Sequence, residues 1–185
     1  MKKFGILIVA FLFLTGVTQA QGKFYTKSGR ITFYLNAPLE DIEATTKTVA
    51  AILDAQTGTL QFSVLMKSFE FKKALMQEHF NENYVESDKF PNGEFKGAIV
   101  NNAEINYSKP GTYTAKVRGQ LTIHGVTKDV STTGTLTIAP DGLKTTSVFN
   151  VTLNDFNIKR PSLVKDKLSN TIQITVDCKL DALNG

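Results

Sequence analysis

The residues able to carry out acid–base or metal chemistry are few, because the chain has two histidines and one cysteine among its 185 residues. His79 lies beside Glu78 and close to Glu82, and His124 stands just before a glycine much further along the chain. These positions lack the His-x-His and His-Glu-x-x-His spacings of zinc sites, so the group around His79 could hold a metal only weakly. We therefore expect no metal site and no cofactor, and we interpret each histidine as a structural group or as a contact to the polar head of a ligand.

Motifs of nucleophilic and phosphate chemistry are missing from the sequence. It contains no Gly-x-Ser-x-Gly elbow and no glycine-rich phosphate loop after a strand. Adjacent carboxylates such as Glu40 and Asp41 fall in polar loops, where solvated charge is the ordinary explanation. We predict that the protein is not an enzyme. The alternative left open is an enzyme acting on a bound lipid, with His79 or His124 as its acid or base.

The single cysteine, Cys178, lies in an alternating run with Ile174, Val176 and Leu180. One cysteine cannot form an internal disulfide, and a lone thiol in an oxidising compartment survives best when it is buried. We predict that Cys178 is a small core residue on the apolar face of the last strand; a reactive thiol is the alternative.

The first twenty residues are organised like a secretory signal peptide, with Lys2 and Lys3 followed by an apolar run over residues 4–17. That run is shorter than the roughly 20 residues needed to span a bilayer, which argues against a permanent membrane anchor. We predict that residues 1–20 are removed and that 21–185 form one domain, periplasmic or secreted. Loss of the two lysines lowers the formal charge from +4 to +2, and no basic stripe is present, so no nucleic-acid partner is expected.

Apolar residues alternate with polar ones along most of the remaining chain, which is the pattern of strands with one apolar face. The alternating sets are Ile31, Phe33 and Leu35; Leu60, Phe62, Val64 and Met66; Val117, Gly119, Leu121 and Ile123; Val130, Thr132, Gly134, Leu136 and Ile138; and Phe149, Val151 and Leu153. Turn signals at 56–58, 109–111 and 140–142 separate them. Eight or nine such strands with short connections predict an all-β fold, and eight can close into an antiparallel barrel.

A membrane barrel with an apolar outer wall would show the same alternation. Paired aromatic girdles are missing from the strand ends, and a helix-like stretch interrupts the pattern at 72–80. These features favour a barrel whose apolar face points into the lumen.

Two segments together resemble the YceI-like family: SFEFKKALMQEHFNENYVESDKFPNGEFK at 68–96 and LTIHGVTKDV at 121–130. The first joins a strand end, a helix-like stretch and the pair Phe90-Pro91, and the second is typical of a hairpin that turns at Gly125. The resemblance covers nearly the whole chain after residue 22. It implies a closed antiparallel eight-stranded barrel, similar to a lipocalin, that holds a long isoprenoid or other lipid. The sequence departs from the family pattern at 91–94, which predicts a differently shaped rim.

The composition is consistent with an apolar lumen, because the chain has thirteen phenylalanines and no tryptophan. Gly97, Gly119 and Gly134 fall in phase with the large apolar residues, which predicts an inner wall that lacks bulk at these points. We predict that the lumen and a helical lid present Phe62, Val64, Phe69, Phe71, Leu75, Phe80, Phe90, Phe95, Leu121, Ile123, Phe149, Val151 and Ile174 to the ligand. His79 and His124 are the candidate contacts to its head group.

The function that the family resemblance, the signal peptide and the apolar lumen together predict is the extracytoplasmic binding, sequestration or transport of a long apolar lipid of polyisoprenoid type, with a homodimer as a possible assembly. Two alternatives stay open. The glycines could be bends, and the phenylalanines could simply pack a solid core. A barrel filled in this way would suit a secreted stress-response or interaction module whose outer threonines, such as Thr133, Thr135 and Thr137, bind a partner protein.

Overall fold

The computed structural model describes residues 22–37, 41–160 and 169–183, which are mostly β-strand. The predicted signal peptide at 1–20 lies outside the described residues. The strands are β1 (Lys23–Leu35), β2 (Ile42–Asp54), β3 (Thr59–Leu65), β4 (Glu70–Phe71), β5 (Asn92–Ile99), β6 (Gly111–Ile123), β7 (Val126–Ala139), β8 (Gly142–Thr152) and β9 (Thr171–Ala182). The helical elements are α1 (Ala74–His79), η1 (Met66–Ser68), η2 (Phe80–Tyr84), η3 (Asn102–Glu104) and η4 (Leu153–Phe156).

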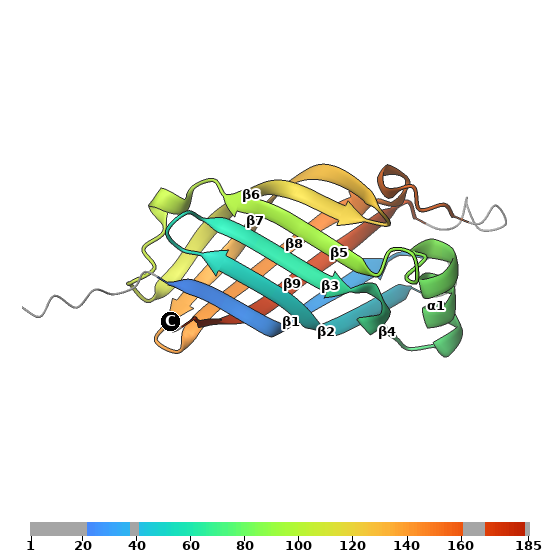
Figure 1. Ribbon diagram of the computed structural model, residues 1–185, viewed down its shortest axis with the longest axis horizontal. Coiled ribbons are helices and arrows are strands. Elements are labelled where there is room, and N and C mark those ends of the chain that lie inside the picture. The colour runs from blue at the N-terminus through green and yellow to red at the C-terminus, as the bar shows by residue number, and fades with distance from the viewer. Residues whose placement is uncertain (1–21, 38–40, 161–168, 184–185) are drawn as a thin grey trace, which may run out of the picture.

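Eight of these strands close into a barrel. The pairing order is β1-β9-β8-β7-β6-β5-β3-β2, and β2 pairs again with β1, so the sheet returns to its first strand. Every pairing is antiparallel. The short β4 pairs with β2 beyond the end of β3. The segment beside β2 is therefore made of two strands, β3 and β4, with η1 between them. The predicted eight-stranded lipocalin-like architecture is confirmed, and Figure 1 shows α1 lying across one end of it.

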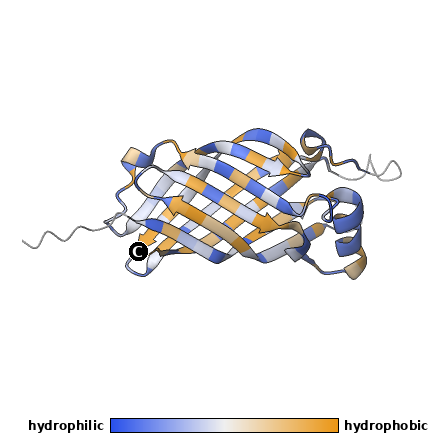
Figure 2. Ribbon diagram, in the orientation of Figure 1, coloured by the Kyte–Doolittle hydropathy of each residue, from blue (hydrophilic) through white to orange (hydrophobic). Residues whose placement is uncertain are grey.

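The inner and outer faces of the wall follow the alternation of the sequence. Figure 2 shows hydrophobic and hydrophilic residues alternating along the strands. The predicted hairpin between β6 and β7 is present, with Ile123 opposite Val126 and Gly119 opposite Val130. Gly125 turns this hairpin at a φ of 71°, a left-handed conformation that glycine adopts without strain.

A pair of facing bulges shifts the alternation in β1 and β2. The register slips between Thr26 and Gly29 in β1, and opposite this point the inward positions of β2 pass from Thr46 to Val49. A side chain at Gly29 would clash with Cys178 Sγ, so the glycine makes room for the thiol. Cys178 is fully buried, which confirms its prediction as a core residue of the last strand.

The wall forks between β7 and β8. These strands pair only from Gly134 opposite Ser147 to Ala139 opposite Gly142. The first half of β7 therefore pairs with β6 alone, and the last part of β8, from Val148 onward, pairs with β9 alone (Figure 1). Beyond this fork, η4 lies between the two strands and buries Leu153 and Phe156.

Candidate functional site

A cavity of about 590 Å³ occupies the lumen. This volume falls within the roughly 300–1,000 Å³ typical of small-molecule sites. Its walls come from β1, β2, β3, β5, β6, β7, β8 and β9, so the cavity runs along the barrel axis. The barrel is therefore hollow, and the alternative of a lumen packed solid with side chains does not describe this structure.

One end of the cavity, here termed the closed end, is lined by aliphatic residues with at most 5% of their surface exposed: Leu53, Leu60, Ile99, Leu143 and Leu180. Hydrogen bonds reinforce the connections beyond it. Tyr107 Oη donates to Asn102 Oδ1 at 2.7 Å, and Asn102 Nδ2 donates to the carbonyl of Ala55 at 3.0 Å. These bonds tie η3 to the turn after β2 and close the barrel at this end.

The other end, here termed the mouth, is lined by Ile42, Phe71, Met76, His79, Phe80 and Tyr84. Phe80 is the centre of an aromatic cluster, with ring centroids 5.1 Å from Phe71, 5.3 Å from Phe33 and 5.8 Å from Phe69. Aromatic rings at these separations attract one another as well as burying apolar surface. The cluster thus fixes α1 and η2 across the end of the barrel as an apolar lid, in the region of the predicted insertion at 72–80.

Eleven of the thirteen apolar residues predicted to face the ligand line the cavity: Phe62, Val64, Phe69, Phe71, Phe80, Phe95, Leu121, Ile123, Phe149, Val151 and Ile174. Two do not. Leu75 is 60% exposed on the outside of α1, and its neighbour Met76 faces the cavity in its place. A helix of six residues can present only one narrow side to the lumen, and the sequence pattern did not fix which side.

Phe90 also lies off the cavity wall, because it packs against the β6–β7 hairpin. Its ring centroid is 4.7 Å from that of His124 in an edge-to-face arrangement, and a side chain at Gly125 would meet the Phe90 ring at 2.5 Å. Phe90 therefore holds the connection before β5 against the hairpin at the mouth.

His124 joins three segments and does not line the cavity. Its Nε2 lies 2.8 Å from a carboxylate oxygen of Glu86, and its Nδ1 lies 3.1 Å from the carbonyl oxygen of Phe156. The hydrogen bond from His124, together with the charge of Lys89, lowers the pKa of the Glu86 carboxyl. Only 13% of the His124 side chain is exposed, and its backbone has a φ of 52° at the turn of the hairpin.

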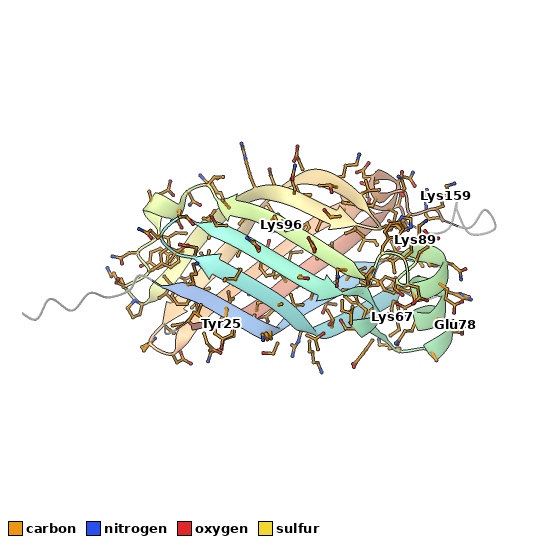
Figure 3. The ribbon with its side chains drawn as sticks, in the orientation of Figure 1. Tyr25, Lys67, Glu78, Lys89, Lys96 and Lys159 are labelled. Atoms are coloured by element: carbon orange, nitrogen blue, oxygen red, sulfur yellow. The ribbon has the colours of Figure 1, made fainter. Side chains whose placement is uncertain are left out.

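His79 borders the mouth from the end of α1 and is otherwise exposed. Burial raises the pKa of the nearby Tyr84 phenol, so this second polar group at the mouth is neutral. Figure 3 shows Glu78 on the outside of α1 and Lys96 on the outer face of β5. Lys96 forms an ion pair of 2.9 Å with Glu94. Charge therefore gathers on the outside of the barrel, and His79 is the ionisable group best placed to meet a ligand at the mouth.

The inward glycines of β5 and β6 do not leave open space. Gly97 and Gly119 are opposite each other, and a side chain at Gly119 would lie 2.5 Å from the Gly97 backbone and 2.7 Å from the Phe95 ring. The two glycines let Phe95 lie flat against the wall. At Gly97 and Gly119 the Phe95 ring occupies the space that side chains would take. Gly134, in contrast, lines the cavity.

Sequence reasoning missed a group of hydroxyl side chains on the cavity wall. Thr132, Thr145 and Ser147 all line the lumen beside Gly134, at and just below the β7–β8 fork. The alternation of β7 predicts an inward Thr132, but the predicted alternating sets do not include the first part of β8. A search for alternation from residue 143 to 151 would have placed Thr145 and Ser147 on the inner face.

Within residues 22–37, 41–160 and 169–183, no group of three or more His, Cys, Asp or Glu side chains is arranged to hold a metal ion. Among the same residues, no helix has the length and apolar character required to cross a membrane.

These features define a class of protein, the lipocalin-like barrels that enclose a ligand cavity. The sequence profile of the YceI-like domain matches residues 9–180. The chain belongs to the YceI-like family, as its two motifs indicated. A comparison with curated proteins finds no match.

Solved structures share the fold at low sequence identity. A polyisoprenoid binding domain from Saccharophagus degradans implicated in plant cell wall breakdown superimposes with a TM-score of 0.76 at 10% identity, covering 88% of this chain and 99% of that one. BcnA from Burkholderia cenocepacia gives 0.69 at 18% identity, covering 84% and 96%. The YCEI protein of Campylobacter jejuni gives 0.56 at 15%, covering 78% and 88%. At these identities the likeness supports the barrel architecture alone.

Proposed function

We propose that the protein binds a long apolar lipid of polyisoprenoid type in its lumen, without turnover, and sequesters or carries it outside the cytoplasm. The observation that carries this proposal is the cavity of about 590 Å³, whose wall is mainly aliphatic and aromatic. The description of the Saccharophagus degradans domain as polyisoprenoid binding supports the choice of ligand class. The signal-peptide pattern of residues 1–20 supports the location.

The size of the cavity sets the size of the cargo. It is about four times the volume of the roughly 150 Å³ cavity that accepts one benzene, so it accommodates on the order of 24 carbon atoms. A longer chain would extend through the mouth past Phe80 and Met76. A short fatty chain would leave part of the lumen empty and lose the corresponding contacts.

The expected affinity follows from the same estimate. Burying about 20 methylene equivalents contributes on the order of 15 kcal/mol before costs. Association and ordering of a flexible tail remove about 4–15 kcal/mol of this. When these costs stay below about 7 kcal/mol, at least about 8 kcal/mol remains, which corresponds to a dissociation constant in the micromolar range or below for chains that fill the lumen.

Binding is tested by mixing delipidated protein with a prenyl alcohol of about 20 carbons, the length that nearly fills the lumen, and separating the two by gel filtration. The proposal predicts that the alcohol elutes with the protein at one molecule per barrel. Transfer between donor and acceptor vesicles, accelerated by catalytic amounts of protein, would distinguish carriage from storage. Elution of the alcohol away from the protein at micromolar concentrations would contradict the proposal.

A further inference from the structure

The hydroxyl side chains at the β7–β8 fork form the polar part of an otherwise apolar wall. Thr132 Oγ1 lies 3.1 Å from Ser147 Oγ, so these hydroxyls bridge the two strands where the backbone pairing ends. Ser147 Oγ also donates to the carbonyl oxygen of Thr133 at 3.3 Å. This carbonyl points toward β8 at a level where the ladder has ended, and the serine gives it a partner.

The end of the β7–β8 pairing does not account for the hydroxyl group of Thr145 on the cavity wall. Thr145 lies within the paired part of β8, opposite Leu136 of β7 and Cys178 of β9, and it lines the cavity. Among the described residues, none donates a hydrogen bond to its Oγ1 or accepts one from it, whereas a hydroxyl in apolar surroundings is strongly favoured to have a partner. Residues two apart on a strand share a face and lie about 7 Å from each other, so Thr145 and Ser147 can both reach one group in the lumen.

Gly134 leaves this polar strip uncovered. It is opposite Ser147, and a side chain there would lie 2.7 Å from the Thr146 carbonyl oxygen and 3.2 Å from Ser147 Cβ. Because glycine occupies this position, no side chain at residue 134 lies over Ser147. A ligand can therefore approach the hydroxyl of Ser147 directly.

The strip suits a neutral group and not a charged one. Among the described residues, the ionisable side chains that border the cavity are those of His79 and Tyr84, at the mouth, and of Glu94, which is paired with Lys96 outside the barrel. No lysine or arginine among the described residues lines the cavity. An ionised phosphate or carboxylate at mid-lumen would lose its hydration without gaining a counter-charge.

We propose that the hydroxyls of Thr132, Thr145 and Ser147 form a subsite, here termed the hydroxyl strip, that hydrogen-bonds a neutral oxygen function of the cargo. The matching chemistry is an alcohol, a carbonyl or a primary amide on a long apolar chain. The oxygen function lies beside the inner face of β8, and the apolar chain occupies the rest of the lumen between the closed end and the aromatic mouth. This inference rests on the proposed function, because it requires that an apolar chain occupies the lumen.

The test compares ligands of equal length with and without the oxygen function. The protein is titrated with geranylgeraniol, with the hydrocarbon of the same carbon skeleton, and with geranylgeranyl diphosphate. Affinities are then measured for the wild type and for Thr145→Val and Ser147→Ala. Thr137→Val, at an exposed position on the outer face of β7, is the matched control. Thermal unfolding of each free variant identifies any effect on folding.

The hydroxyl strip predicts that the wild type prefers the alcohol over both other ligands. Thr145→Val and Ser147→Ala should each weaken alcohol binding about three- to tenfold, while hydrocarbon binding stays unchanged or becomes tighter. Thr137→Val should change neither affinity.

Equal affinity of the wild type for the alcohol and the hydrocarbon would overturn the hydroxyl strip. Equal effects of Thr145→Val on the two ligands would overturn it too. Either result would leave the proposal of lipid binding in the lumen intact. A preference for the diphosphate would overturn the neutral character of the strip. Failure of every ligand to bind would overturn the proposed function as well.

Discussion

Val117 lies on the inner face of β6, half-buried, in the middle of the cavity wall, and a larger side chain there would occupy space that the cargo needs. Val117→Trp adds about seven non-hydrogen atoms, slightly more than one benzene equivalent of the cavity. The lumen of the wild type accommodates roughly 24 carbons by the same measure. The variant should therefore hold on the order of 17 carbons.

The assay is a series of prenyl alcohols of about 10, 15, 20, 25 and 30 carbons, each competing with a fluorescent polyene lipid for the lumen. Each added carbon contributes up to about 0.8 kcal/mol while it is buried and nothing once the lumen is full. Wild-type affinity should rise with chain length and level off near 25 carbons. For Val117→Trp it should level off between 15 and 20 carbons, with at least about tenfold weaker binding of the 20-carbon alcohol.

Val148→Trp is the matched control, because Val148 is 55% exposed on the outside of β8 and carries the same substitution away from the lumen. It should keep the wild-type plateau. If affinity rose without a plateau, or if Val148→Trp shortened the plateau while Val117→Trp did not, the assignment of the lumen as the binding site would be refuted.

Three further outcomes are expected. Phe80→Ala should weaken binding of a 20-carbon chain about tenfold, because the ring lines the mouth. Leu75→Ala, on the solvent side of α1, should change this affinity less than about twofold. Similar effects of the two substitutions in a titration would contradict the placement of the lid. Cys178 should resist thiol reagents at pH 8 in the folded protein and react after denaturation in urea, because burial raises its pKa to about 11. Stoichiometric labelling of the folded protein would contradict this prediction and show that the last strand opens. The lowered pKa of Glu86 means that its contact with His124 stabilises the fold above the ordinary pKa of 4.5 and that this contribution is lost as the pH falls through the lowered value. Glu86→Gln should therefore show a smaller loss of urea resistance between pH 6 and pH 3 than the wild type, and an unchanged or larger loss would count against this contact.

The barrel could be predicted from sequence because most strands keep an uninterrupted period of two. Phe149, Val151 and the run ending at Leu180 all face the lumen or the core as their alternation indicated. Strand β2 was not identified as one of the alternating sets. Its inward positions include the small residue Ala44 and the polar Thr46, and the bulge before Val49 reverses the phase.

The predicted site was most accurate on the wall and least accurate at the mouth. A strand residue can point only inward or outward, so Phe62 and Leu121 follow from the pattern alone. The orientation of Leu75 depends on how α1 and η2 dock onto Phe33, which is a tertiary contact between distant segments. The prediction places Phe90 at the lid or lumen because it is apolar, but its partner, the hairpin at Gly125, becomes adjacent only when β5 pairs with β6.

The hydroxyl strip shows a different limit of sequence reasoning. The alternation predicts that Thr132 lies on the inner face. Its contact with Ser147 across the fork, however, depends on where the β7–β8 pairing ends. A ladder that continued past Ser147 would pair the backbone at this level and leave no fork for the hydroxyls to bridge. Beyond the end of this ladder η4 contacts both strands, and the residue types of β7 and β8 do not indicate where the pairing stops.

The measurement that tests the central claim most directly is native mass spectrometry of the protein purified from the extracytoplasmic fraction of its own host, followed by organic extraction and identification of any released molecule. The account predicts a stoichiometric apolar adduct that carries a neutral oxygen function and that Val117→Trp diminishes. A ligand-free mass for the wild type, with no uptake of added prenyl alcohols, would contradict the account.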